Sequence, residues 1–511
     1  MDMRYVLFLI LIPIGIASST QILGIFTLGC KSTHMYYQTL VKILLDAGYN
    51  VTVIDQFPQT HKIANYTNID VSEDGLIKFD GSLKINEIAE GSLSNLYLGY
   101  NSHLINLQKL YTSKKIRTLL NSGQKFDLVI TELDGAECFL PLAFTLGTSV
   151  VGIYTTIVPF PNVDWMIGNP INPSWLPASL SGFSTSMNFT ERVKNFLDYI
   201  FYFIFGMVYT SYSDALTAKY IPESPPTRQL FDKISLIFTN SNPNLISRPL
   251  LPRNVEIGGI HINKANALPK NIKNFIDEST NGTIFVSFGS TIKFSSLPKE
   301  HHDAFVKVFS TLPYRILWKH DEPELVQNIS KNIMAKRWFP QADILAEDKI
   351  ILFISHCGAL SLYESISRGK PLLAIPIYYD QPMNAAIVHD LKIGLKLNYK
   401  NINEQLLRNS IEKITRDVKF GENMSALSKQ FKDRPTLAAR TFLYWIQFVL
   451  RHRRADHLHH AGKNLSFFQY CLLDVISFLF TILVILLSLT YFLIKMILKK
   501  LRKNPVKRKK N

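Results

Sequence analysis

One stretch of the chain, residues 338–385, gathers glycine, histidine, aromatic and carboxylate residues at close spacing. Its centre is a short apolar, β-rich run that passes through His356, Cys357 and Gly358 into a helix-like segment. A helix that begins beside a glycine turn points unpaired N–H groups and the positive end of its dipole at whatever lies above the strand, which suits a phosphate. The sequence therefore predicts an anion-binding turn at this point.

Polar and aromatic residues on either side of this turn can hold the rest of such a ligand. Trp338 offers a flat apolar face for a base, and Glu364 offers a carboxylate for the two hydroxyls of a ribose. Asp380 and Gln381 follow the next predicted strand, residues 372–377, so they are expected at the same carboxyl edge of a parallel sheet. Base, ribose, diphosphate and sugar each have a candidate partner.

The stretch resembles the donor-binding signature of the UDP-glycosyltransferases, and many positions match it at fixed spacing. Two positions depart from the animal pattern: Cys357 stands where animal members carry a second glycine, and Leu360 is similar to arthropod rather than vertebrate members. The resemblance implies an α/β fold of the GT-B type, in which two Rossmann-like domains face a cleft. It covers nearly the whole chain and indicates an arthropod-like member of the animal microsomal type. The matching residues are Trp338, Pro340, Gln341, His356, Gly358, Ser361, Glu364, Gly369, Pro371, Pro376, Asp380, Gln381, Asn384 and Ala385.

The start of the chain reads as strand, helix, strand and carries a candidate base. Residues 21–28 form an apolar run, a helical pattern follows from His34 to Ala47, and a second strand begins at Val51. The unit lacks G-x-G-x-x-G, which argues against a nicotinamide cofactor. His34 lies at the helix start, at the edge where active sites of such folds form. The resemblance implies that His34 removes the acceptor proton.

Two carboxylates follow a third apolar run and are candidate partners of this histidine. Residues 126–132 are typical of a buried parallel strand, which ends at Glu132, and Asp134 comes two residues later. The family places an aspartate at such a strand end to orient its histidine. The sequence leaves open whether Glu132 or Asp134 takes this role, or whether both are exposed turn residues.

Three further features bear on the substrates. A strand over residues 284–287 ends in a glycine turn that can bring the Ser290 hydroxyl near the diphosphate, whereas Lys319 reads as a solvated lysine. The aromatic, proline-rich segment 155–177 faces the acceptor if the resemblance holds. The four cysteines share no metal-ligand spacing, so we expect no metal site and no cofactor, with the UDP-sugar as co-substrate.

The chain ends predict a membrane protein with a single span. Small residues follow an apolar run near the N-terminus, as in a signal peptide, and residues 475–494 carry no charge over a length of about 30 Å as a helix. Nine Lys or Arg from Lys495 onward favour a cytosolic C-terminus, with the catalytic domains in the lumen. Lys507 and Lys509 resemble the dilysine signal for the endoplasmic reticulum. Sequons for luminal glycosylation occur at Asn65, Asn188, Asn281, Asn328, Asn423 and Asn464.

These patterns divide the chain into segments with distinct roles. The sequence predicts a signal peptide (1–19), an N-terminal acceptor-binding domain (20–262), a linker (263–282), a C-terminal UDP-sugar-binding domain (283–445), a membrane-proximal segment (446–474), a transmembrane helix (475–494) and a basic cytosolic tail (495–511).

The net charge of +16 does not indicate a nucleic-acid binder. Because nine of these charges lie in the last seventeen residues, +7 remains for the rest of the chain. We therefore expect a UDP-sugar donor, a small lipophilic acceptor and a membrane as partners, and no nucleic acid. Homo-oligomerisation is left open.

The expected reaction is inverting transfer of a hexose, glucose in preference to glucuronic acid, to the acceptor hydroxyl. His34 would act as general base, and His356, Ser361 and the helix end would stabilise the departing diphosphate. The alternative is a membrane-anchored protein that binds a nucleotide or a lipophile and has lost transfer, for which Glu132 in place of aspartate is the hint.

Overall fold

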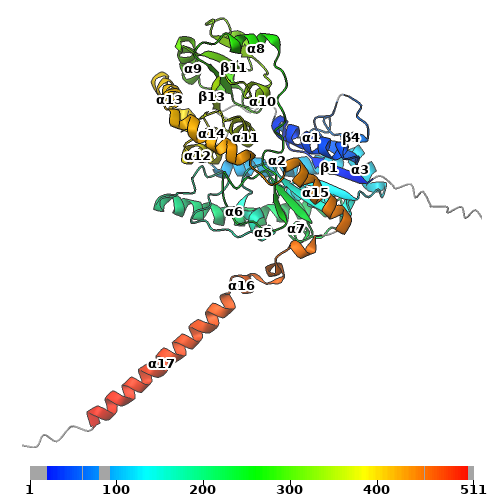
Figure 1. Ribbon diagram of the computed structural model, residues 1–511. Coiled ribbons are helices and arrows are strands. Elements are labelled where there is room, and N and C mark those ends of the chain that lie inside the picture. Colours follow the sequence, from blue (N-terminus) through cyan, green and yellow to red (C-terminus); the bar gives the residue numbers. More distant parts are fainter. Residues whose placement is uncertain (1–19, 60, 80–91, 454, 504–511) are drawn as a thin grey trace, which may run out of the picture. The chain divides into compact units, whose positions relative to one another are not determined.

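Two parallel β-sheets form the core of the computed structural model, which describes residues 20–59, 61–79, 92–453 and 455–503 (Figure 1). The first sheet has the strand order β4-β3-β1-β6-β7-β8-β9, and the second has the order β12-β11-β10-β13-β14-β15. The first comprises β1 (Gln21–Phe26), β3 (Asn50–Asp55), β4 (Tyr66–Asp70), β6 (Leu128–Glu132), β7 (Val150–Tyr154), β8 (Leu236–Thr239) and β9 (Asn254–Glu256). The second comprises β10 (Thr283–Ser287), β11 (Arg315–Lys319), β12 (Ile333–Lys336), β13 (Ile350–Ser355), β14 (Leu372–Ala374) and β15 (Gly394–Lys396). The predicted signal peptide lies outside the described residues.

Helices connect these strands and cover both faces of each sheet. Those of the first half are α1 (Lys31–Asp46), α2 (Ser92–Thr112), α3 (Lys114–Asn121), α4 (Leu140–Leu146), α5 (Pro161–Ile167), α6 (Phe189–Thr217) and α7 (Thr227–Phe231). Those of the second half are α8 (Lys270–Asp277), α9 (Lys299–Thr311), α10 (Gln341–Ile344), α11 (Ala359–Arg368), α12 (Gln381–Asp390), α13 (Glu404–Arg416) and α14 (Val418–Lys432). A small two-stranded sheet joins β2 (Gly29–Cys30) to β5 (Lys78–Phe79).

The continuous apolar runs of the sequence become strands buried on both faces. Every residue of β6 and of β10 is buried. Separate apolar clusters lie on the two sides of each sheet, as expected when crossover helices cover both faces of a parallel sheet. The carboxyl ends of β1, β3 and β6 lie at one edge, because β1 pairs in parallel with both of the others. That edge is where candidate residues from the first half collect.

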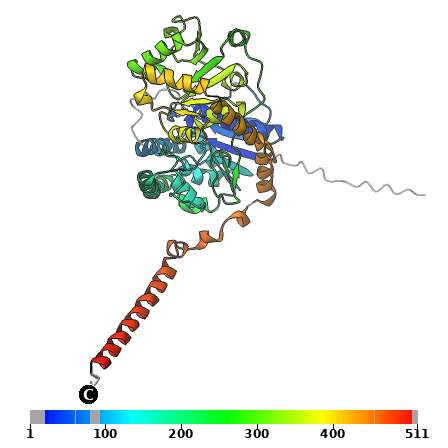
Figure 2. The same cartoon turned by 60° about the vertical axis from the view of Figure 1, so that its left-hand side comes forward.

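The last helix of the large unit corrects one predicted domain boundary. α15 (Ala438–His452) falls partly within the predicted C-terminal domain, yet it packs against β8 and α1 of the first half. Its buried side chains Phe442, Ile446 and Val449 lie in the same cluster as residues of β1 and β6. Figures 1 and 2 show this orange-brown helix alongside the first sheet. The chain therefore crosses back after α14, and residues 438–445 belong with the N-terminal half.

Residues 459–503 form a second, separate unit. It contains α16 (Phe467–Tyr470) and α17 (Leu473–Lys503), and an 18-residue window within residues 473–502 of α17 has a mean hydropathy of 2.5. Within the described residues, this is one helix long and apolar enough to cross a membrane, judged by length and composition. It includes the predicted span 475–494 and extends beyond it at both ends.

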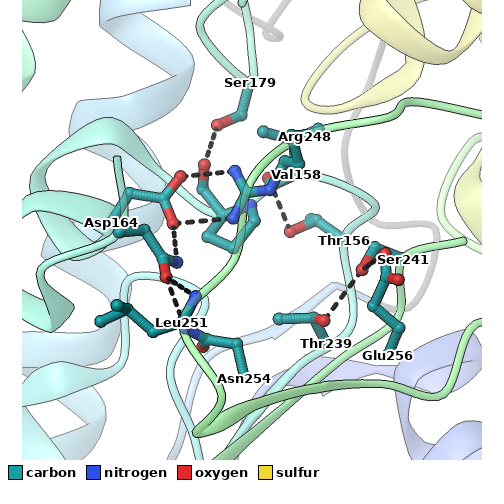
Figure 3. Close-up of polar contacts among 12 residues, drawn as sticks. Thr156, Val158, Asp164, Ser179, Thr239, Ser241, Arg248, Leu251, Asn254 and Glu256 are labelled. Atoms are coloured by element: carbon teal, nitrogen blue, oxygen red, sulfur yellow. Dashed lines mark hydrogen bonds and ion pairs between the residues drawn. The ribbon is translucent and has the colours of Figure 1, made fainter. Parts of the chain in front are cut away.

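A buried ion pair fixes the segment that follows β7. Arg248 donates from Nη1 and Nη2 to the two carboxylate oxygens of Asp164, at 2.6 and 2.8 Å, and both side chains are nearly inaccessible (Figure 3). Asn169 also donates to Asp164 at 2.8 Å. A planar guanidinium that meets a carboxylate with two parallel bonds combines strength with a defined geometry. The pair thus ties α5 to the loop after β8.

Removal of Asp164 should lower the free energy of unfolding by about 3–5 kcal/mol, because Arg248 would then be a buried charge without a counter-ion. Urea denaturation of Asp164→Ala, followed by tryptophan fluorescence, measures this loss. The double variant Asp164→Leu/Arg248→Met serves as the control, since it removes both charges, and we expect it to recover most of the stability. Equal losses in the two variants would show that side-chain volume, rather than the pairing, matters here.

Candidate functional site

The turn between β13 and α11 has the geometry of an anion-binding site. Cys357 adopts φ +66, and its N–H donates to the Ser355 hydroxyl at 3.1 Å, which turns the chain sharply at the strand end. Gly358 is the N-cap residue and has no side chain to cap the helix. The Asp380 carboxylate accepts from the Ala359 N–H, and an anion can bind beside it at the positive end of the helix dipole.

His356 lies between two glycine turns, one from each neighbouring strand. A Cβ atom at Gly289 would lie 2.6 Å from His356 Nε2, and one at Gly358 would lie 2.9 Å from the same atom. Burial, with a smaller contribution from the Lys319 ammonium, lowers the pKa of His356 to about 3. The imidazole is therefore neutral at pH 7, and its single N–H can donate either to the Ser287 carbonyl or to a bound anion.

One cavity, which we call the cleft cavity, brings together residues from both halves of the large unit. Six of the sequence-predicted donor residues line it, namely Ser290, His356, Gly358, Ser361, Asp380 and Gln381. From the first half it is lined by Leu28, Cys30, Ser32, Thr33, Phe79, Leu98, Gly99, His103, Thr155 and Thr156. Tyr379 completes it with an aromatic wall. The cavity thus combines an anion-binding turn, polar groups and an apolar side.

Two other predicted donor residues connect to this cavity through Ser361. Gln341 Nε2 lies 2.9 Å from the Ser361 hydroxyl and 2.6 Å from a carboxylate oxygen of Glu364. Burial raises the pKa of Glu364 to about 7, partly offset by the hydrogen bond from Gln341. Gln341 at the start of α10 and the face of α11 that carries Ser361 and Glu364 together provide donors and acceptors suited to a pair of neighbouring hydroxyls.

Hydrogen bonds hold the side chains of the two sugar-binding candidates, Asp380 and Gln381, in place. Asn384 donates to Asp380 at 2.7 Å, and the Gln381 amide oxygen accepts from the N–H groups of Ile377 and Tyr378 at 2.9 and 3.1 Å. The Gln381 amide nitrogen is therefore the group that can reach a ligand. Burial raises the pKa of Asp380 to about 6.

Trp338 lies at the boundary between the two halves, and 47% of it is exposed. The ammonium groups of Lys31 and Lys319, one from each half, lie 4.4 and 4.3 Å from the centre of its ring. Lys319 is not the solvated lysine that the sequence predicted. Its Nζ donates to the Gly289 carbonyl at 2.5 Å, and burial lowers its pKa to about 8. A base stacked on the indole would take the place of one of these ammonium groups.

His34 lies in a neighbouring cavity and not in the cleft cavity. Its Nδ1 is 2.8 Å from a carboxylate oxygen of Asp55, and its Nε2 is 2.5 Å from the amide nitrogen of Gln38. The preceding residue, Thr33, is the one that lines the cleft cavity. Since successive residues of α1 point in directions about 100° apart, the side chains of Thr33 and His34 face different cavities.

Neither of the predicted partners, Glu132 and Asp134, contacts His34 in this structure. Glu132 accepts from the N–H groups of Thr27 and Leu28 at 2.9 and 2.7 Å and from the Tyr37 hydroxyl at 2.7 Å, so it holds the turn after β1. Burial raises its pKa to about 7. The carboxylate beside His34 is that of Asp55, at the end of β3.

Asp134 supports the cavity wall from behind. It accepts hydrogen bonds from the N–H and hydroxyl of Thr155 and from the hydroxyl of Thr156, and both threonines line the cleft cavity. Burial raises its pKa despite these bonds. Thr155 and Thr156 begin the segment 155–177 that was expected to face the acceptor, whereas the sequence analysis did not single out His103, which stands in a segment with no local motif.

Comparisons with known proteins agree with this geometry. The family model described as "UDP-glucoronosyl and UDP-glucosyl transferase" matches residues 103–511. A UDP-glycosyltransferase of Dactylopius coccus (UGT5) is 35% identical over 95% of this chain and 94% of its own length, and a UDP-glucosyltransferase of the same insect is 32% identical over 91% and 90%. UDP-glucuronosyltransferase 2B16 of Oryctolagus cuniculus is 30% identical over 78% and 76%.

A solved structure supports the fold independently of sequence. The UDP-glucosyltransferase of Polygonum tinctorium, solved with 3,4-dichloroaniline, aligns with a TM-score of 0.56 at 15% identity, over 85% of this chain and 99% of its own. The prediction of two Rossmann-like domains of the GT-B type is confirmed. The chain belongs to the family of UDP-glucuronosyl and UDP-glucosyl transferases.

Proposed function

We propose that this protein transfers glucose from UDP-glucose to the hydroxyl of a small lipophilic acceptor, with inversion at the anomeric carbon. The observation that carries the proposal is the cleft cavity, where six predicted donor residues face side chains of the other half. One insect relative is named a glucosyltransferase and the rabbit relative a glucuronosyltransferase. The arthropod-like Leu360 and the insect relatives support glucose as the sugar.

The donor would extend across the second half of the cavity. The N–H groups of α11, His356 and Ser361 would hold the diphosphate, Ser290 would add a hydroxyl, and Glu364 would bind the ribose hydroxyls. Fixed dipoles of this kind stabilise charge on the departing diphosphate without reorganising. Asp380 and Gln381 would bind the sugar. Both substrates in one cavity meet as in an intramolecular reaction, which lowers the barrier further.

Apolar groups of the first half suit a lipophilic acceptor. Leu28, Phe79 and Leu98 line the cleft cavity together with the ring of Tyr379. Small-molecule sites are mostly apolar, with a few polar groups that fix orientation. An aromatic alcohol placed here would direct its hydroxyl toward the polar end of the cavity.

Transfer also requires a group that takes the proton of the acceptor hydroxyl. The resemblance gives this role to His34, and the Asp55 carboxylate, 2.8 Å from Nδ1, holds the orientation of its ring. In this conformation, however, the ring faces a different cavity from the donor residues. His34 can serve as the base once its side chain rotates away from Asp55 and Gln38.

The placement of His34 favours a second candidate function. A protein that binds a UDP-sugar or a lipophile, but has lost transfer, would keep the donor residues and need no base in the cleft. This alternative predicts UDP binding with no glycoside formed.

Incubation of the full-length protein in detergent with UDP-glucose and a panel of phenols should yield β-glucosides, identified by mass spectrometry and by the anomeric proton in NMR. UDP-glucuronic acid should give at least about tenfold less product, since substrate selectivity from a few polar contacts reaches this size. UDP binding without product from any UDP-sugar would support the binding protein, and an α-glycoside would contradict inversion.

We also propose that α17 anchors the protein in the membrane of the endoplasmic reticulum, with both sheets in the lumen. The apolar length of α17 and the basic residues that begin at Lys495 support this orientation. The predicted sequons would then be exposed to glycosylation.

A further inference from the structure

The outer side of α6 carries a continuous row of exposed apolar side chains, and the proposed transfer reaction does not account for it. The side chains recur every three or four residues, so they lie on one face of the helix. Figures 1 and 2 show α6 on the outside of the large unit, and each side chain of the row is 41–73% exposed. We call this surface the α6 face, and its central row is Phe189, Val193, Phe196, Ile200, Ile204 and Met207.

The α6 face is long and wide for an exposed surface. Leu197, Val208 and Tyr212, which are at least half exposed, widen it on one side. From Phe189 to Tyr212 it extends about 35 Å along the helix axis. Single exposed apolar residues are normal on a protein surface, whereas a continuous apolar face marks a site of interaction.

Charged residues stand at the ends of the α6 face and are nearly absent between them. Residues 195–213 include one charged residue, Asp198, which is half-buried, and burial raises the pKa of its carboxyl. Arg192 and Lys194 at the start of α6 and Lys219 just after its end are exposed. A helix whose outer side faces water normally carries charged residues there. The distribution instead suits an apolar surrounding with basic groups at its margins.

The helix that presents this face is firmly held in the large unit. Its first turn is closed by a capping box that includes Glu191. Near its end, Asp214 accepts from the N–H and the hydroxyl of Thr227 at 2.8 and 2.6 Å. On the inner side, the buried Tyr209 donates to the Gly135 carbonyl at 3.0 Å. The acidic side chains at the two ends are thus bonded within the protein, and the basic ones face outward.

The rest of the chain indicates lipid as the partner of this face. Residues 459–472 connect the large unit to α17, which is proposed above to span a membrane, and fully extended they reach at most about 50 Å. This tether keeps the α6 face at a high effective concentration of lipid. Basic residues at its ends match the phosphates of lipid headgroups, whereas a second copy of the chain would bring the same positive charges.

On the basis of the proposed anchorage by α17, we propose that α6 lies in the plane of the membrane interface, with the α6 face buried among lipid headgroups and upper acyl chains. Its apolar side chains reach about 5–10 Å into this boundary, as in other interfacial helices. Arg192, Lys194 and Lys219 contact the lipid phosphates. The large unit then has a second attachment to the bilayer, which fixes its orientation on the membrane surface.

Fluorescent labels on the full-length protein test this contact. In a Cys471→Ser background, cysteine replaces Ile200 or Ile204 of the α6 face, or Val418, which is 71% exposed and lies outside the face. Each variant is labelled with a nitrobenzoxadiazole dye and reconstituted as one copy per nanodisc of phosphatidylcholine and phosphatidylserine. The signal from the half-buried Cys30, measured in the Cys471→Ser protein alone, is subtracted.

Lipids with a spin label near the headgroup should quench the dyes at positions 200 and 204 at least about twofold more than lipids labelled near the chain end, because the face reaches only about 5–10 Å into the boundary. The dye at position 418 should not be quenched. A dye on Leu486→Cys, within α17, tests the anchorage separately, through quenching by the lipid labelled near the chain end. Quenching at 486 without quenching at 200 and 204 would overturn the α6 proposal alone, whereas no quenching at 486 would contradict the anchorage, and the α6 proposal would fail with it.

A charged variant and a copy-number control distinguish lipid from a second copy of the chain. Phe196→Glu/Ile204→Glu should abolish quenching at position 200 and leave the melting temperature in detergent unchanged, because both side chains are exposed. Persistent quenching at position 200 in this variant would show that the apolar side chains do not make the contact. A blue-shifted dye that lipids do not quench, seen only in nanodiscs with two copies, would show that a second copy covers the face and would overturn the lipid assignment.

Discussion

Gly289→Ala should reduce kcat/KM for the UDP-sugar by about a thousandfold, because the new methyl group would displace His356. A Cβ at this position would lie 2.6 Å from Nε2 and 2.7 Å from Cε1 of His356. Gly289 also has φ +73, a backbone conformation that costs an L-residue about 1 kcal/mol. The loss of one preorganised donor at a departing anion typically costs a factor of about 10²–10³ in rate. Displacement of the Gly289 carbonyl from Lys319 would add to this loss.

Steady-state kinetics with UDP-glucose measure the effect, and calorimetric titration with UDP shows whether diphosphate binding falls in parallel. Gly123→Ala is the matched control: Gly123 has φ +68, and no atom lies within 4 Å of its added Cβ. It therefore carries the same backbone strain without the clash, and its activity should stay within about twofold. A Gly289→Ala variant with near-normal kcat/KM would show that transfer does not depend on the position of the His356 ring between the two glycine turns.

The donor half of the site could be predicted from the sequence because its residues are fixed by local geometry. Ser361 and Glu364 are three positions apart on one helix, so they share a face wherever the helix is placed. Asp380 follows β14, whose register against β13 brings the two carboxyl ends together. For such residues, sequence spacing and secondary structure suffice.

The first half of the site was predicted less well, and the reason is the register of one helix. The sequence analysis began that helix at His34, whereas α1 begins at Lys31, three residues earlier. His34 therefore stands inside the helix, and its side chain points at Asp55 instead of into the cleft cavity. A cue was available, since Asp55 ends β3 in the same way as Glu132 ends β6. His103 gave no such cue, because tertiary packing alone brings the middle of α2 to the cavity.

Asp380→Asn should lower kcat/KM several-hundredfold, because a charged acceptor for sugar hydroxyls would be lost. Each hydrogen bond to a buried carboxylate contributes about 1.5–3 kcal/mol. The Asn384 amide nitrogen donates to one oxygen of Asp380 at 2.7 Å and also to the Cys357 carbonyl at 3.0 Å, so it cannot turn to accept. An asparagine at 380 has one carbonyl oxygen, which can serve either Asn384 or the sugar. The substitution thus removes the sugar contact or the contact that positions it.

The swapped variant Asp380→Asn/Asn384→Asp distinguishes these causes. It restores one amide and one carboxylate, so we expect the thermal stability to recover while kcat/KM stays low, because the charge is displaced from the sugar.

The pH profile gives a second readout. Burial raises the pKa of Asp380 to about 6, so the protonated and less effective form becomes abundant below that pH. Wild-type kcat/KM should therefore fall as the pH drops through about 6. Asp380→Asn should no longer show this decrease, but it should keep the decrease in kcat/KM that protonation of Glu364 causes near its pKa of about 7. If the swapped variant regained full activity, the charge at position 380 would not be the feature that the sugar recognises.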